Sequence, residues 1–179
     1  ETNEISQPDF KDDALKKFVM EGIGGIFFDS KNVVWLGSYL NSGFRIADKK
    51  TLQPIPFFSG NEKNQLKGFP VKGFFEDSKA KIWILSENGL YSYERNSNLF
   101  QRYVSSKRPG DTITYSANNV IEDKDGVIWV SLAANPPFYT SIAKVDPQSA
   151  TFKIYYYVDN DERGLAWGWA AFIFQDRSG

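Results

Sequence analysis

Two irregular stretches of the sequence combine aromatic rings with planar polar side chains. Residues 133–140 contain Asn135 and Tyr139, and residues 159–169 contain Arg163, Trp167 and Trp169. Aromatic faces suit the apolar faces of sugar rings, and a guanidinium can pair with a carboxylate or a sulfate. These residue types therefore predict an oligosaccharide site. The alternative is that Trp167 and Trp169 only seal one end of a structural unit.

Other kinds of chemistry are excluded by the residues that the chain lacks. Its 179 residues include no Cys and no His, which excludes zinc thiolates, disulfides, Cys nucleophiles and Ser–His triads within it. Asp, Glu, Tyr and Arg could serve paired-carboxylate catalysis, but no pair stands apart from the repeat described below. We therefore expect no catalytic residue, no metal and no cofactor.

Charge and hydropathy narrow the possible partners. The chain has 21 basic and 22 acidic residues, a net charge of −1, and the two signs are interspersed. No basic stripe is available to neutralise phosphates, so nucleic acid is not expected as a partner. No apolar run reaches the roughly 18–20 residues of a membrane span, so no membrane contact is expected within this segment.

An internal repeat must position the two irregular stretches. Residues 23–36, 71–84 and 117–130 align without gaps, and a fourth copy begins at residue 170. Each complete copy has an Asp six residues before a Trp, and successive Asp residues are 48, 46 and 53 positions apart. The aligned residues are Asp29 and Trp35, Asp77 and Trp83, Asp123 and Trp129, with Asp176 in the fourth copy.

The segment between Asp and Trp predicts a tight β-hairpin. Three residues before Trp stand Asn32, Ala80 and Gly126, with Gly179 at the matching position of the fourth copy. Asn and Gly tolerate the positive φ that a type I turn with a bulge requires. Ala80 is the exception, and we expect either strain or a differently shaped turn there.

Further apolar segments complete a four-stranded unit. Third strands are expected over residues 89–94 and 142–146, and fourth strands over residues 52–58, 99–104 and 151–158. Four strands in about 47 residues define a β-propeller blade, and the chain is predicted to be all-β. The repeated Trp residues should fill the space between blades, and the repeated Asp residues should close turns.

The expected domain boundaries follow from this repeat. Residues 1–21 would be the outer strand of a preceding blade and a linker, and residues 167–179 the start of a truncated fourth blade. Blades 1, 2 and 3 would span residues 22–68, 69–116 and 117–166. Since closed propellers have more blades, we expect the chain to be a fragment whose partner is the rest of its own polypeptide.

The repeated motif resembles the two-component regulator propeller repeat. The third copy, Val-Ile-Glu-Asp-Lys-Asp-Gly-Val-Ile-Trp-Val, is the closest match; the second copy lacks the Gly, and the first has Phe28 in place of the Glu. The resemblance spans residues 22–179. It implies the periplasmic sensor region of a membrane-bound protein, notably the hybrid two-component histidine kinases of Bacteroidetes.

Propeller geometry places the candidate ligand residues on one face. Turns 1–2 and 3–4 of each blade share one face, and the longer 2–3 and 4–1 loops share the other. Tyr39, in the 2–3 loop of blade 1, should join Asn135, Tyr139, Arg163, Trp167 and Trp169 there. A non-catalytic sensor for an oligosaccharide is the favoured function. A scaffold for protein–protein interaction and a propeller glycosidase or lyase are the alternatives.

Overall fold

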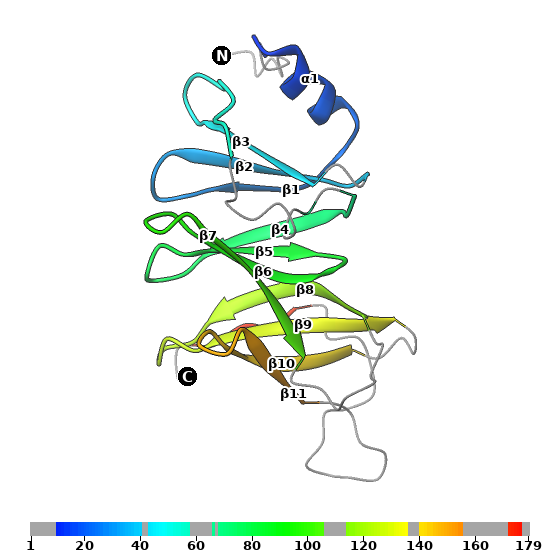
Figure 1. The fold of residues 1–179 in the computed structure, drawn as a ribbon, viewed down its shortest axis with the longest axis vertical. Coiled ribbons are helices and arrows are strands. Elements are labelled where there is room, and N and C mark those ends of the chain that lie inside the picture. The colour runs from blue at the N-terminus through cyan, green and yellow to red at the C-terminus, as the bar shows by residue number, and fades with distance from the viewer. Residues whose placement is uncertain are drawn as a thin grey trace.

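The computed structural model describes residues 10–40, 43–57, 66, 68–105, 114–135, 140–155 and 172–176. These residues form one helix and eleven strands, which stack in layers along the long axis (Figure 1). The elements are α1 (Asp13–Met20), β1 (Ile23–Phe28), β2 (Val33–Ser38), β3 (Phe44–Asp48), β4 (Val71–Glu76), β5 (Ile82–Ser86), β6 (Gly89–Glu94), β7 (Leu99–Ser105), β8 (Thr114–Glu122), β9 (Ile128–Asn135), β10 (Thr140–Asp146) and β11 (Thr151–Tyr155).

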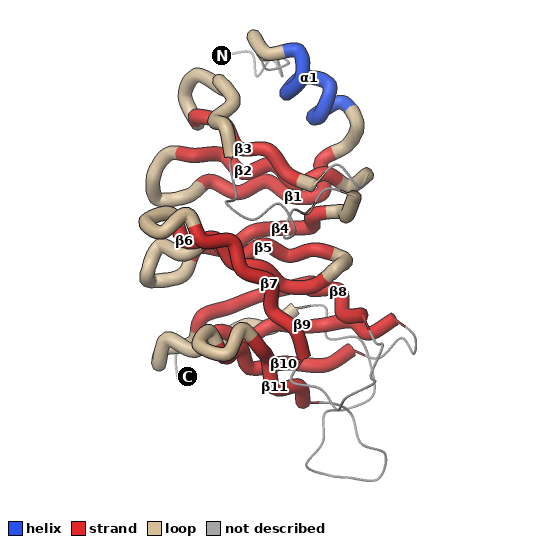
Figure 2. Tube along the Cα trace, viewed as in Figure 1, coloured by secondary structure: helices blue, strands red, loops and turns tan. Residues whose placement is uncertain are grey.

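The strands form three successive antiparallel meanders. Blade 1 is β1-β2-β3, blade 2 is β4-β5-β6-β7 and blade 3 is β8-β9-β10-β11, each in sequence order. Figure 2 shows these strand layers with turns at both edges. The last strands of blades 2 and 3 pair in parallel over only two residues, Thr151 with Val104 and Phe152 with Ser105. The predicted all-β propeller blades are confirmed.

Residues 52–57 do not form the fourth strand that was expected in blade 1 over residues 52–58. In the described part, the only pairing is an isolated bridge between Ala47 and Pro54, and Ile55 donates its N–H to the Ile46 carbonyl over 2.8 Å. Leu52 has a φ of 54°, outside the extended region, and the described residues after it form only this one bridge with β3. The expectation of a strand is therefore wrong for residues 52–57.

The outer strand expected within residues 1–21 is also wrong where the chain is described, because Asp13–Met20 is helical. The Asp12 side chain caps the helix by accepting the Leu15 N–H over 2.7 Å. Leu15 and Phe18, three positions apart, share one helix face and are buried. They pack on the outer face of blade 1, formed by Val34, Leu36 and Ala47.

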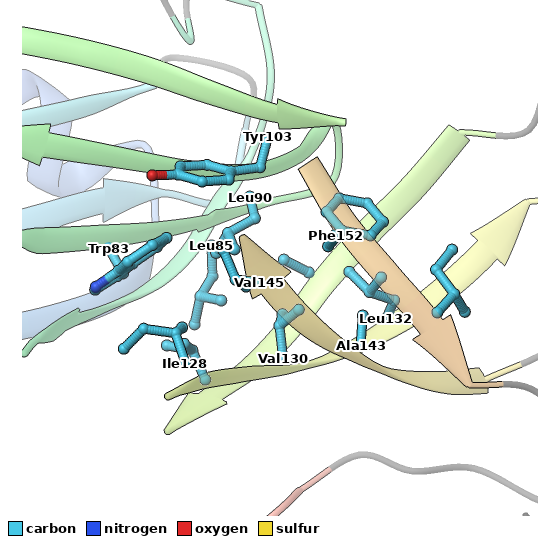
Figure 3. Packing of buried hydrophobic residues seen from close by; sticks show 13 residues of the cluster. Trp83, Leu85, Leu90, Tyr103, Ile128, Val130, Leu132, Ala143, Val145 and Phe152 are labelled. Carbon is cyan, nitrogen blue, oxygen red and sulfur yellow. The ribbon is translucent and has the colours of Figure 1, made fainter. Parts of the chain in front are cut away.

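Three hydrophobic layers hold the stack together. Helix α1 covers one face of blade 1, and Trp35 on the other face packs against Ile82, Ile84 and Tyr91 of blade 2. Trp83 of blade 2 likewise joins the layer between blades 2 and 3 (Figure 3). Because blade 2 is covered on both faces, every residue of β5 is buried. The prediction that the repeated Trp fills the space between blades is confirmed for Trp35 and Trp83, each 1% exposed.

The hairpins between first and second strands share one backbone geometry. Asn32, Ala80 and Gly126 have φ of 60°, 60° and 76°, and each donates its N–H to the carbonyl of the repeated Asp. Ala80 therefore adopts the same turn as its counterparts. Since a left-handed conformation costs a residue with a Cβ about 1–2 kcal/mol, the sequence exception marks strain and not a different turn.

The first strands of blades 1 and 2 approach each other closely. A Cβ added to Gly25 would lie 2.5 Å from the Lys72 carbonyl oxygen and 2.9 Å from the Gly73 Cα. Only a residue without a side chain fits between these two backbones. Strand β8 begins at Thr114, so the boundary expected between residues 116 and 117 falls inside a strand.

Candidate ligand-binding site

The repeated Asp residues are bound to the repeated Trp residues of their own blades. The indole Nε1 of each Trp donates to Oδ2 of the Asp six positions earlier, over 2.6, 2.9 and 2.7 Å in blades 1, 2 and 3. Oδ1 of each Asp accepts two backbone N–H groups of the turn, as in Asp77 with Lys79 and Lys81. The expected turn-closing role is confirmed, and the indole contact is an additional one.

These contacts lower the pKa of the Asp123 carboxyl group. The Trp129 indole and the N–H groups of Val127 and Asp125 stabilise the charged form, so the pKa of Asp123 lies below its usual 3.8, although partial desolvation opposes this. A carboxylate held charged by fixed donors is suited to holding a turn. It is poorly suited to exchanging protons at neutral pH.

A second repeated contact joins each hairpin to the next blade. The residue after the repeated Asp donates its backbone N–H to the Glu or Gln that precedes the next repeated Asp. The three pairs are Ser30 with Glu76 (2.7 Å), Ser78 with Glu122 (2.6 Å) and Lys124 with Gln175 (2.9 Å). The two Ser hydroxyls donate to the same carboxylates. Residues 172–176 thus contact blade 3 as the first strand of a further repeat would.

Arg95 reinforces the contact between blades 1 and 2. Its guanidinium donates to the carboxylate of Asp29 and, over 3.3 Å, to Glu76 Oε1. It also lies 6.0 Å from the centre of the Trp35 ring. Among the described residues, the carboxylates of the repeat are therefore occupied by structural partners.

The two kinds of turn lie at opposite edges of the blade stack. Turns β1–β2, β4–β5 and β6–β7 lie at the left in Figure 1, and the β5–β6 turn lies at the right. We call the first the short-turn edge and the second the long-loop edge. The long-loop edge contains residues 22–24, 38–40, 71–73, 86–89 and 115–119. The expected separation of the turns is observed for these elements.

The predicted ligand residues are described only in part. Tyr139, Arg163, Trp167 and Trp169 lie outside the described residues, and Asn135 is described only as the last backbone position of β9. Tyr39 lies at the long-loop edge with its residue surface 69% exposed, and its N–H is bound to the Gly22 carbonyl. The structure therefore places one of the six, and the grouping of the six stays a prediction.

A polar cluster at the long-loop edge was not expected from the sequence. The Lys72 ammonium donates to Ser116 Oγ over 2.8 Å and to Asn118 Oδ1 over 3.3 Å, and it lies 3.8 Å from the Glu87 carboxylate. These four residues come from blades 2 and 3. The only sequence signal was Lys72, a charged residue in a largely apolar segment; Asn118 stands among other polar residues, Ser116 and Asn119.

Lys72 and Asn118 occupy the same bulged position in their blades. The pairing of first and second strands shifts register between Ile23 and Gly25, between Val71 and Gly73, and between Ala117 and Asn119. The extra residues, five positions before the repeated Asp, are Gly24, Lys72 and Asn118. A bulge leaves one residue outside the ladder and re-aims its side chain, so it can serve binding without disturbing the sheet.

A cavity of about 530 Å³ lies elsewhere, between blade 3 and residues 172–176. It is lined mainly by Ile121, Trp129, Ile142, Ile173 and Phe174. The corresponding face of blade 1 packs against Ile82 and Ile84 of blade 2. The cavity therefore lies on a blade-packing surface and not at the long-loop edge.

Within the described residues, no group of three or more acidic side chains is arranged to hold a metal ion. The same described residues contain no helix with the length and apolar character that crossing a membrane needs.

Stacked antiparallel blades, four-stranded in blades 2 and 3, with an indole–carboxylate pair in each blade define a β-propeller arc. In fold, the chain is similar to the extracellular domain of a candidate one-component system from B. thetaiotaomicron, with a TM-score of 0.57 and 14% identity over 89% of this chain. It is also similar to the extracellular domain of a candidate hybrid two-component system from the same organism, with a TM-score of 0.56 and 19% identity over 84% of this chain.

The chain corresponds to 19% and 17% of those two structures, less than a fifth of each. It matches no protein-family model and no curated protein. Both structural neighbours are of the kind to which the repeat motif pointed, extracellular domains of signalling systems. At these identities the comparison shows the propeller fold alone.

Proposed function

We propose that this chain is a ligand-sensing segment of a periplasmic β-propeller in a two-component type of sensor. The observation that carries the proposal is the agreement between the repeat motif and a fold similar to extracellular domains of such systems. The remaining polypeptide would supply further blades and an output domain such as a histidine kinase, as the resemblance implies.

We propose an oligosaccharide as the ligand, bound at the long-loop edge. Tyr39 offers an exposed aromatic face there, and Lys72, Glu87 and Asn118 offer hydrogen-bond donors and acceptors of the kind that fix sugar hydroxyls. From the rule that 2–3 and 4–1 loops share one face, we expect the loops that contain Tyr139, Arg163, Trp167 and Trp169 at the same edge.

The contacts of the described repeat carboxylates favour a binding function over a catalytic one. Asp29, Asp77 and Asp123 are each bound to an indole and to turn N–H groups, and Glu76 and Glu122 are bound to the hairpins of the preceding blades. Glycoside hydrolysis needs a carboxylate pair that is open to substrate. Each of these five carboxylates already accepts hydrogen bonds from protein donors.

Intrinsic fluorescence tests the proposal. Defined neutral and acidic oligosaccharides would be titrated into the protein while Trp emission is followed. Trp35 and Trp83 are buried and hydrogen-bonded, so a response should come from Trp residues in the loops. We expect at least one oligosaccharide to shift the emission of the wild type and not that of the Trp167→Ala/Trp169→Ala variant. A wild type that responds to no oligosaccharide would contradict the proposal.

A protein-interaction scaffold is the second candidate, and exposed apolar side chains on β1 favour it. Ile26 is 61% exposed and Phe28 is 54% exposed. At the positions matching Phe28, blades 2 and 3 have Glu76 and Glu122, which bind the preceding hairpin. The scaffold predicts no response to any oligosaccharide, together with partner binding that Phe28→Lys abolishes.

A further inference from the structure

We propose that Lys72, Glu87 and Asn118 form a subsite for adjacent hydroxyl groups of a neutral saccharide, with Tyr39 beside it as an aromatic platform. The inference rests on the proposed function, since it names the class of saccharide and the residues that select it. It goes beyond the loops predicted from the sequence, because these residues belong to strands and tight turns of the blades.

The variation among the three bulged residues supports a role in recognition. Each complete blade repeats the Asp, the Trp and the bulge. The bulged residue instead changes from Gly24 to Lys72 to Asn118. Gly24 fits the close approach of blade 2, whereas in blades 2 and 3 the same backbone position presents two polar side chains that meet each other, as a binding surface requires.

The donors and acceptors of the cluster match a pair of hydroxyls. An ammonium has three donors, and Lys72 uses two of them on Ser116 and Asn118. Glu87 is 3.8 Å away, which is within ion-pair range but too long for a hydrogen bond. The third donor of Lys72 and the acceptors of Glu87 therefore lie side by side. A sugar hydroxyl can accept from the first while its neighbour donates to the second.

Local charge selects against an anionic ligand at this position. The positive charge of Lys72 is already balanced by Glu87, so a carboxylate or sulfate placed on Lys72 would also meet the like charge of Glu87. A neutral saccharide has no such repulsion. The side chains of Lys72 and Glu87 are 36% and 52% exposed, so both can be reached from solvent.

Tyr39 is connected to this cluster through Gly24, the bulged residue of blade 1. A Cβ added to Gly24 would lie 2.7 Å from the Val71 carbonyl oxygen and 3.5 Å from the Ser38 carbonyl carbon. Ser38 precedes Tyr39 and Val71 precedes Lys72 in the chain. Gly24 thus lets the backbones of blades 1 and 2 come together at this edge, and the next residues along the two segments are Tyr39 and Lys72.

The test is a set of calorimetric titrations on the full chain with a panel of neutral and acidic oligosaccharides. The neutral members are xylan, arabinan, mannan and glucan oligosaccharides, and the acidic members are oligogalacturonates and heparin fragments. Lys72→Met should weaken binding of the neutral oligosaccharide about tenfold or more, as expected for loss of a charged hydrogen-bond donor. Lys79→Met is the matched control, because Lys79 belongs to the same blade and is exposed at the short-turn edge.

Glu87→Gln separates recognition from a merely structural role of Lys72. Glu87 contributes only a long, exposed ion pair, so its replacement should leave the thermal midpoint almost unchanged. In the proposed site it should weaken the neutral ligand and strengthen binding of the acidic oligosaccharides, because it leaves Lys72 unbalanced. Lys72→Arg, which keeps the charge, should retain more neutral binding than Lys72→Met.

The outcomes are distinct. The subsite is supported if Lys72→Met loses binding of the neutral oligosaccharide and Lys79→Met keeps it. Glu87→Gln should then bind the neutral oligosaccharide more weakly and the acidic oligosaccharides more tightly. If none of the Lys72 and Glu87 variants changes binding of the neutral oligosaccharide, the subsite is overturned and the proposed function stands. The same holds if the wild type binds only acidic oligosaccharides. A wild type that binds no oligosaccharide overturns both.

Discussion

Ser78 donates both its backbone N–H and its hydroxyl to the carboxylate of Glu122 in the next blade, each over 2.6 Å. The same two donors of Ser30 bind Glu76 one blade earlier. Residues 44 and 46 positions apart are thereby joined at the short-turn edge. These contacts fix the rotation of one blade relative to the next, while the apolar layers supply most of the attraction.

Removing the Ser78 hydroxyl should weaken the contact between blades 2 and 3. Ser78→Ala should lower the free energy of unfolding by about 1 kcal/mol, the usual net value of a hydrogen bond, because the hydroxyl is lost and the N–H is kept. A double-mutant cycle with Glu122→Ala, followed by urea denaturation, should give a coupling of about 0.5–1 kcal/mol. Lys79→Ala in the same hairpin should change stability by less than about 0.5 kcal/mol. Additive effects of the two substitutions would show that the contact is not formed.

The repeated Asp residues should differ in importance according to the burial of their Trp partners. Asp77→Ala removes three hydrogen bonds and leaves the Trp83 indole N–H buried without an acceptor, so a loss of about 3 kcal/mol is expected. Trp129 is only partly buried, and water can replace Asp123 at its indole. Asp123→Ala should therefore cost about 1–2 kcal/mol. Equal losses, measured by thermal or urea unfolding, would contradict this ranking.

Ala80 offers a stabilising substitution. Its φ of 60° is strained for Ala and relaxed for Gly, while Gly raises the entropy of the unfolded chain. Ala80→Gly should therefore stabilise the protein by about 0.5–1 kcal/mol, which corresponds to a rise of roughly 1–4 °C in Tm for a domain of this size. Gly126→Ala makes the reverse change in the matching hairpin of blade 3, where φ is 76°, and should destabilise by a similar amount. A loss of stability in Ala80→Gly would show that the turn is not strained.

Stability should fall at acid pH through three turn carboxylates. The pKa of each is lowered mainly by one hydrogen bond. At Asp48 the main donor is the backbone N–H of Thr51. At Asp123 it is the Trp129 indole, and at Asp146 it is the Ser149 hydroxyl. Each group binds a proton more weakly in the folded state than in the unfolded state. Its contribution is therefore complete above the ordinary pKa of 3.8 and disappears as pH falls through the lower folded value.

Urea denaturation between pH 6 and pH 2.5 checks this pH dependence. The free energy of unfolding should decrease below about pH 4, which is the ordinary range of an Asp carboxyl. The decrease should be shallower in the Asp48→Asn/Asp146→Asn variant, which cannot titrate at two of the three positions. An unchanged slope in that variant would rule out these turns as the cause.

Much of the blade architecture follows from local sequence rules. The Asp-x-x-Gly/Asn spacing predicts the hairpins, and alternating apolar segments predict β6 and β7 almost to the residue. Two predictions failed because competing local effects were stronger. Leu52 leaves the extended conformation where the fourth strand of blade 1 was expected to begin, and the Asp12 cap with Leu15 and Phe18 on one face favours a helix over a strand.

The contacts between blades were less accessible from the sequence. The indole–carboxylate pairs were present as a constant spacing of six residues, but only the folded hairpin shows that the two side chains meet. The Ser–Glu contacts and the Lys72 cluster join residues about 44–46 positions apart, and nothing local relates them. The bulged position is a matter of strand register, which depends on the partner strand. The loops with Tyr139, Arg163, Trp167 and Trp169 lie outside the described residues, so their role stays a prediction.

Hydrogen exchange with and without a bound oligosaccharide is the most direct measurement of where this propeller recognises its ligand. The account predicts slower amide exchange at the long-loop edge, in residues 22–24, 38–40, 71–73, 86–89 and 115–119. It predicts no change in the short-turn hairpins at residues 29–32, 77–80 and 123–126. Protection confined to those hairpins, or no protection anywhere at saturating ligand, would contradict it.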